Sequence, residues 1–171
     1  MIGTSGHTLR ATTSGDREIV TALLEASYQR LLAADYDPRL LARALPLMTK
    51  ANPRLLESGT YYVVETRDGS AVGCGGWTLE VPGGGASSRG VGHIRHFAIH
   101  PEWTRQGIGK ALLRHCIEEA RALGIGQLEC LSTLTAIAFY ESAGFIPVAK
   151  TEVQMSPTVT FPSLLMRFEF L

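Results

Sequence analysis

The residues whose types and spacing most clearly suggest a binding site lie between His100 and Gly124, in the stretch "HPEWTRQGIGKALLRHCIEEARALG". Gly107 and Gly109 stand one residue apart, where a long amphipathic helix begins. The first N–H groups of a helix have no partner within it and lie at the positive end of its dipole, so they form a site for an anion such as phosphate. Glycines let the phosphate approach the backbone, and Arg105 and Lys110 add positive charge. The pattern predicts a phosphate-binding helix start; the alternative is that the glycines only relieve close packing.

The motifs of two common phosphate ligands are incomplete. GxxxxGK[ST] is absent because Ala111 follows Lys110, which disfavours a nucleoside-triphosphate loop. GxGxxG is half met, since Leu112 stands where the third glycine would be, and "HPEWTRQ" separates the glycines from the preceding strand. A dinucleotide-binding module therefore remains only as an alternative.

The elements that must position these residues follow from hydrophobic periodicity and turn residues. They run in the order β-α-α-β-β-β-α-β-α-β-β, which predicts an α/β protein with a mixed central sheet and helices on both sides. Pro46 is expected to end or kink the second helix. The helix after the glycines carries an apolar stripe of Ile108, Leu112, Cys116, Ala120 and Leu123. The remaining elements are an edge strand at 8–13, helices at 15–32, 38–50 (with Asp37 as its cap) and 135–144, strands at 61–66, 71–81, 92–100, 127–131, 145–155 and 163–171, and a flexible loop at 82–90.

Composition limits the function classes. The 171 residues are 45% hydrophobic and 19% charged, which predicts one domain over residues 1–171. Sixteen basic residues balance sixteen acidic ones, which argues against a nucleic-acid partner. No apolar run is long enough for a bilayer and the first residues lack a signal core, so a cytoplasmic protein without a membrane partner is expected. The three cysteines form no CxxC, and no metal site is expected.

Two segments resemble the GNAT family of N-acetyltransferases. "FAIHPEWTRQGIGKALL" is similar to the family signature, in which a strand and a proline precede Q/R-x-x-G-x-G/A at a helix start. "AFYESAGF" resembles a second segment, in which a tyrosine precedes a glycine–aromatic pair. The resemblance covers nearly the whole chain. Two positions depart from it: Thr104 occupies the Q/R position, with Arg105 next, and Thr135 stands near a frequent asparagine.

The resemblance implies acetyl-CoA as co-substrate. In the family it lies between two parallel strands that splay apart, here 93–99 and 127–131, and its pantetheine arm pairs with the free strand backbone. Its pyrophosphate sits on the N–H groups from Arg105 to Lys110. The implied cofactor-binding residues are Phe97, Ala98, Ile99, Arg105, Gln106, Gly107, Ile108, Gly109, Lys110, Thr135 and Phe139.

The implied reaction is direct attack of an amine on the thioester carbonyl. Tyr140 is assigned as the general acid for the departing thiolate, and a backbone N–H near Phe97 or Ala98 as the oxyanion donor. In the histone-acetylating branch a glutamate is the base, and its position falls on His93 here. His96 is the weaker candidate because three residues along a regular strand reverse the face; an ordered-water route is the other alternative.

The implied acceptor is a primary amine of a small molecule or a protein, and the sequence does not identify which. Tyr36, Trp77, Glu80 and Arg167 could line its site. Members of the family are often homodimers, although no interface is visible in this sequence. The competing function is a sensor that binds acetyl-CoA without turnover.

Overall fold

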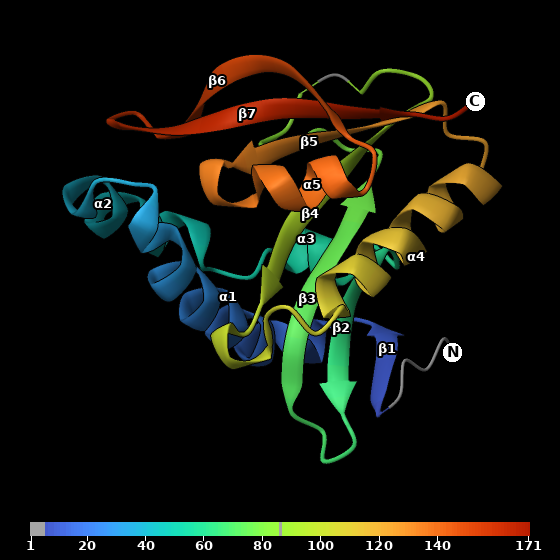
Figure 1. Cartoon of the computed structure of the whole chain (residues 1–171), viewed down its shortest axis with the longest axis horizontal. Helices are drawn as coiled ribbons and strands as arrows, with labels where there is room; N and C mark the ends of the chain where they lie inside the picture. The colour runs from blue at the N-terminus through green and yellow to red at the C-terminus, as the bar shows by residue number, and fades with distance from the viewer. Residues whose placement is uncertain (1–5, 86) are drawn as a thin grey trace.

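The computed structural model describes residues 6–85 and 87–171, which form a seven-stranded mixed sheet flanked by helices (Figure 1). The strands are β1 (His7–Ala11), β2 (Tyr61–Thr66), β3 (Ala71–Thr78), β4 (Val91–Ile99), β5 (Gln127–Thr133), β6 (Ile146–Ser156) and β7 (Val159–Glu169). The α-helices are α1 (Arg17–Leu31), α2 (Pro38–Met48), α3 (Pro53–Leu56), α4 (Ile108–Ala122) and α5 (Ile137–Ser142). None of these helices combines the length and apolar character needed to cross a membrane.

The strand order is β1-β2-β3-β4-β5-β7-β6, which places β1 at an edge as predicted. The expected α/β class and the mixed sheet are confirmed. Among the described strands only β4 and β5 pair in parallel, and every other pairing is antiparallel. A dinucleotide-binding sheet is mostly parallel, so this topology does not support the dinucleotide-binding alternative.

Helices cover both faces of the sheet because alternate side chains of β3 point to opposite sides. Trp77 packs with Leu112 and Leu113 of α4, whereas Cys74 packs with Leu24 of α1 on the other face. Figure 1 shows α4 in front of the sheet and α3 behind it. The central strands are therefore buried on both faces.

The two parallel strands separate, as the resemblance implied. β4 and β5 pair only from Val91–Gln127 to His93–Glu129, although β4 continues to Ile99. In the part of the chain that the structure describes, the edge of β4 that faces β5 has no strand partner beyond His93. This divergence opens the sheet next to the start of α4.

A β-bulge lies in the diverging part of β4. Arg95 pairs with Gly76 and Ala98 with Cys74, so β4 carries one more residue than β3 between these pairs. His96 has a φ of 43°, and its carbonyl accepts a hydrogen bond from the Tyr61 hydroxyl at 2.8 Å. The bulge invalidates the regular face count that was applied to His96, because an extra residue breaks the alternation.

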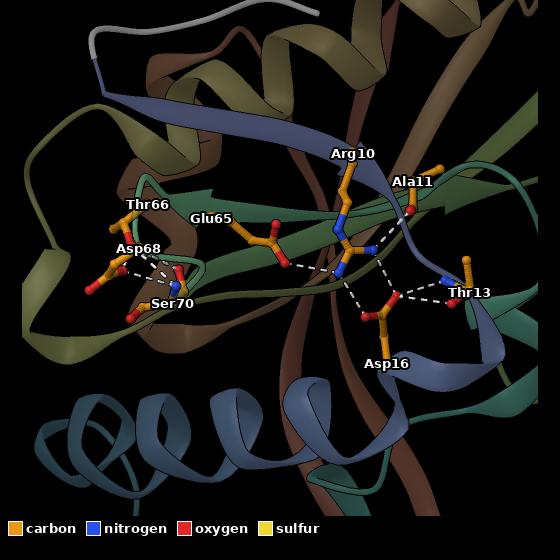
Figure 2. A network of polar contacts seen from close by, with 8 residues as sticks. All are labelled: Arg10, Ala11, Thr13, Asp16, Glu65, Thr66, Asp68 and Ser70. Atoms are coloured by element: carbon orange, nitrogen blue, oxygen red, sulfur yellow. Dashed lines mark hydrogen bonds and ion pairs between the residues drawn. The ribbon is translucent and has the colours of Figure 1, made fainter.

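A half-buried ion pair connects the first strand to the turn before the first helix (Figure 2). The guanidinium of Arg10 on β1 donates to both carboxylate oxygens of Asp16, at 2.9 and 2.8 Å, and to Glu65 of β2 at 2.9 Å. Asp16 also accepts from the Thr13 backbone N–H at 2.8 Å. One arginine therefore connects β1, β2 and the turn that starts α1.

Two sequence predictions need correction, and one element was not predicted. α2 continues two residues past Pro46 because the proline lies in the last turn, where its missing N–H affects only the exposed Ala42 carbonyl. Leu123 is not part of the apolar stripe: it follows the last residue of α4 and is 64% exposed. The short helix α3 was not predicted, because its four residues are too few for a periodic signal.

Candidate active site

A cavity of about 460 Å³ occupies the space opened by the diverging strands. It lies between α1, the end of β4, the start of α4, and the segment that leads into α5. Its lining residues are Ser27, Tyr28, Leu31, Leu32, Phe97, Ala98, Ile99, Trp103, Thr104, Arg105, Gly107, Ile108, Gly109, Lys110, Thr133, Thr135, Ala136, Phe139, Tyr140 and Ser142.

The structure brings almost all of the predicted site residues to this one cavity. The exceptions are Gln106, which is exposed on the loop before α4, and His93. His93 lies at the last paired position of β4 and β5, where the strands begin to separate. Segments more than forty residues apart in sequence therefore meet at the cavity.

The two glycines at the start of α4 have different structural roles. Gly107 is the residue before the helix, with a φ of 81° and open space where a Cβ would be. Gly109 is buried, and a Cβ there would lie 3.2 Å from the Phe139 ring. The anion-site interpretation fits Gly107, whereas close packing explains Gly109.

Arg105 also has a left-handed backbone, with a φ of 61°. Among the described residues other than glycine, only Arg105 and His96 have positive φ. Such conformations cost free energy and occur where the surrounding structure imposes them, often at functional sites. Both lie in segments that border the cavity.

Tyr140 is 5% exposed and belongs to an aromatic cluster around the cavity. Its ring centroid lies 5.0 Å from that of Phe139, 5.5 Å from that of Phe145 and 6.3 Å from that of Phe97. Burial raises the pKa of Tyr140 well above its ordinary value. The phenol is therefore protonated at neutral pH, which is the state a proton donor requires.

His93 is 8% exposed, and its Nε2 is enclosed without a hydrogen-bond partner among the described residues. Its register partner Glu129 forms an ion pair with Arg167 at 3.2 Å. Burial lowers the pKa of His93, and it lowers the pKa of His96 to about 4. Both imidazoles are therefore neutral near pH 7 and able to accept a proton.

Tyr28 begins the segment, about Tyr28 to Pro53, that the family resemblance assigned to the acceptor side, and it lines the cavity. Its hydroxyl donates to the Phe97 carbonyl at 3.1 Å, which ties α1 to the diverging part of β4. The two residues are far apart in the sequence and share no motif. No local pattern could have identified this contact.

The structure places Thr135 at the cavity, and it places the acceptor candidates Trp77 and Tyr36 in the core. The Thr135 hydroxyl donates to Asp35 at 2.8 Å and lines the cavity. The Trp77 indole donates to Glu119 of α4 at 2.7 Å, and Tyr36 bridges the Pro162 carbonyl and the Leu134 N–H. Neither Trp77 nor Tyr36 lines the cavity, because each is held within the core.

Comparison with known proteins assigns the family. The model of the Acetyltransferase (GNAT) family matches residues 19–145, so the chain belongs to the GNAT acetyltransferase family. A [Ribosomal protein bS18]-alanine N-acetyltransferase of Escherichia coli (strain K12) is 43% identical over 53 residues, which are 29% of this chain and 36% of that protein. An IAA acetyltransferase of Azospirillum brasilense is 32% identical over 115 residues, 65% of this chain and 67% of that protein. The match to the Escherichia coli protein therefore spans only about a third of its length.

Solved structures share the fold. A GCN5-related N-acetyltransferase from Rhodopseudomonas palustris has a TM-score of 0.75 at 19% identity, with 99% of each chain covered. The PaiA N-acetyltransferase from Thermoplasma acidophilum, in complex with coenzyme A, has a TM-score of 0.73 at 14% identity, covering 97% of this chain and 100% of that chain. At these identities the likeness concerns the fold.

Proposed function

We propose that this chain transfers an acetyl group from acetyl-CoA to a primary amine of a small molecule or a protein. The observation that carries the proposal is the cavity where β4 and β5 diverge, with the start of α4 and the buried Tyr140 on its walls. Membership of the acetyltransferase family supports it. A relative in fold that was solved with coenzyme A supports this co-substrate.

The pyrophosphate of acetyl-CoA binds the N–H groups from Arg105 to Lys110. The left-handed backbone at Arg105 and Gly107 shapes this segment, and the helix dipole of α4 adds to the attraction. The pantetheine arm runs along Phe97–Ile99, where β4 has no partner on its β5 side. Phe139 and Thr135 contact the co-substrate from the opposite wall.

In the reaction the amine nitrogen attacks the thioester carbonyl carbon. The new C–N bond forms as the C–S bond breaks, and the developing oxyanion is stabilised by a backbone N–H at Phe97 or Ala98. Tyr140 gives its hydroxyl proton to the departing thiolate. The proton that the amine loses passes to His93, which lies beside the cavity and not in its lining, or leaves by an ordered-water route without His93.

The test is an assay of thiol release from acetyl-CoA with a panel of amines that includes antibiotics, polyamines, amino acids and peptides. Acetylated product, identified by mass spectrometry, is expected for at least one class. Tight binding of acetyl-CoA without thiol release for any amine would contradict the proposal and favour the sensor. Failure to bind acetyl-CoA would contradict both functions.

A further inference from the structure

A second cavity, of about 250 Å³, lies on the α3 side of the sheet and shares no lining residue with the first. α3 forms one wall, and the end of β3, the following loop and β4 form the others. Its lining residues are Asn52, Arg54, Leu55, Ser58, Thr78, Glu80, Val81, Gly83, Gly84 and Arg95. This volume suits part of a small molecule rather than a drug-sized ligand.

The buried charge of this cavity is Arg95, which is 7% exposed. Its Nη1 donates to the Thr78 hydroxyl at 2.9 Å and is 3.5 Å from the Glu80 carbonyl. Its Nε is enclosed without a partner, and within residues 6–85 and 87–171 no carboxylate pairs with it. Buried charges are normally paired, because an unpaired one loses its hydration without compensation.

Among the described residues that line this cavity, the one carboxylate is that of Glu80, and it already forms an ion pair. Glu80 pairs with Arg54 at 3.1 Å, and both side chains are partly exposed at the mouth of the cavity. That pair is neutral as a whole, so the charge that the cavity presents is the guanidinium of Arg95. A planar guanidinium with unused N–H donors matches a carboxylate in shape and charge.

Arg95 is connected to the proposed reaction site through β4. Phe97, Ala98 and Ile99 follow it and line the larger cavity. Residues two apart on a strand share a face at ~6.7 Å, so His93 lies beside Arg95 on the same side of the sheet. Ala98 faces that side too, since it packs with Cys74 and the α1 residues.

We infer that the cavity beside Arg95 binds a carboxylate of the amine acceptor, so that the acceptor is a small molecule whose carboxylate is separated from its amine by a chain long enough to join the two cavities. This inference rests on the proposed acetyl transfer. The carboxylate takes donors of the Arg95 guanidinium other than the enclosed Nε, and the amine reaches along β4 toward the thioester. Thr78 fixes the guanidinium by accepting from its Nη1 and donating to the Glu80 carbonyl at 2.8 Å.

The experiment compares kcat/KM for ω-amino acids of increasing chain length with kcat/KM for their carboxamides, which retain the amine and lose the negative charge. The wild-type protein is expected to prefer the carboxylates by about tenfold or more, equivalent to ~1.4 kcal/mol. Arg95→Met is expected to remove the preference by raising KM for the carboxylates, with acetyl-CoA affinity unchanged in calorimetry. Arg95→Lys keeps the positive charge and is expected to retain part of the preference for carboxylates. Arg54→Met, at the exposed mouth, is the matched control and is expected to retain most of this preference.

Acetylation of amines without any preference for carboxylates would overturn this inference and leave the proposed function intact. A preference for phosphorylated over carboxylated amines would overturn it as well. If Arg95→Met does not fold, the test is a thermal-shift measurement on the wild-type protein. N-acetyl ω-amino acids should raise its Tm more than the corresponding N-acetyl carboxamides. Equal shifts would contradict the inference without any use of turnover.

Discussion

Tyr140 and His93 are both buried, and burial moves their pKa values in opposite directions. It raises the pKa of the phenol and lowers the pKa of the imidazole, because in each case it disfavours the charged form. Near neutral pH the phenol therefore carries a proton to give, and the imidazole has a free site to receive one. At the scale of single residues, burial therefore leaves each group in the protonation state that its proposed role requires, while it makes the phenol a weaker acid and the imidazole a weaker base.

Tyr140→Phe removes only the hydroxyl and is expected to lower kcat by about 10²–10⁴-fold, the usual contribution of a general acid. Acetyl-CoA affinity should change little, because the ring and its aromatic contacts remain. Single-turnover kinetics and calorimetry check the two effects. Tyr62→Phe is the control, since Tyr62 bonds to Glu119 away from the cavity and its loss should not affect kcat. Wild-type kcat for Tyr140→Phe under chemistry-limited conditions would refute the role.

His93→Ala is expected to remove the acidic limb of the kcat/KM profile and to lower its plateau. In the wild-type protein that limb should fall below about pH 6.5, because burial lowers the pKa of His93 and activity is lost only when the imidazole gains a proton. The profile is measured from pH 5 upward, with His96→Ala as the control that retains the limb. A His93→Ala profile that overlays the wild type would favour the ordered-water route.

At the scale of elements, the start of α4 decides the proposed pyrophosphate site. Gly107 and Gly124 flank this helix, with φ of 81° and 76° and open space where a Cβ would be. Only Gly107 lines the larger cavity. The two glycines therefore allow backbone strain to be separated from ligand binding.

Gly107→Ala and Gly124→Ala should each destabilise the fold by about 1–2 kcal/mol, because a Cβ disfavours the left-handed conformation. Only Gly107→Ala is expected to weaken acetyl-CoA binding, by about tenfold or ~1.4 kcal/mol, since relaxation of its backbone redirects the N–H groups of the helix start. Urea unfolding measures the first quantity and calorimetry the second. Equal acetyl-CoA affinity in the two folded variants would place the pyrophosphate elsewhere.

At the scale of the whole molecule, an ion-pair network joins the β1 edge of the sheet to the start of α1. The interactions of Arg10 with Asp16 and Glu65 hold β1, β2 and the start of α1 together (Figure 2). The hydrogen bonds from Arg10 lower the pKa of Asp16. Stability from this carboxylate is present above its unfolded pKa of about 3.9 and is lost as the pH falls through the lower folded value.

Asp16→Asn is expected to reduce the free energy of unfolding at pH 7 by about 1.5–3 kcal/mol, the range for hydrogen bonds to a charged group. The difference from the wild type should shrink as the pH falls below the unfolded pKa of about 3.9, because the carboxylate of the unfolded state gains a proton before that of the folded state. Urea unfolding across this range measures it. Glu57→Gln, at an exposed side chain without an ion pair in the described residues, should change neither value. A difference that does not vary with pH would contradict the electrostatic account.

The sequence by itself determined the features that depend on local periodicity and on short motifs. It predicted the element order apart from the short α3, the edge position of β1, and the stretch that carries Gly107 and Arg105, whereas the divergence of two parallel strands was implied by the family resemblance. These features are readable because a helix start, a turn or a strand is specified by neighbouring residues.

Only the tertiary structure decided which distant groups meet and which donors remain unused. It separated Gly107 from Gly109 by what surrounds each position, and it placed the Tyr28 hydroxyl on the Phe97 carbonyl. It also showed that Arg95 is buried with an unpaired Nε beside a cavity. Such facts depend on contacts between segments far apart in the chain, where the environment of a side chain is set by packing and not by its neighbours in sequence.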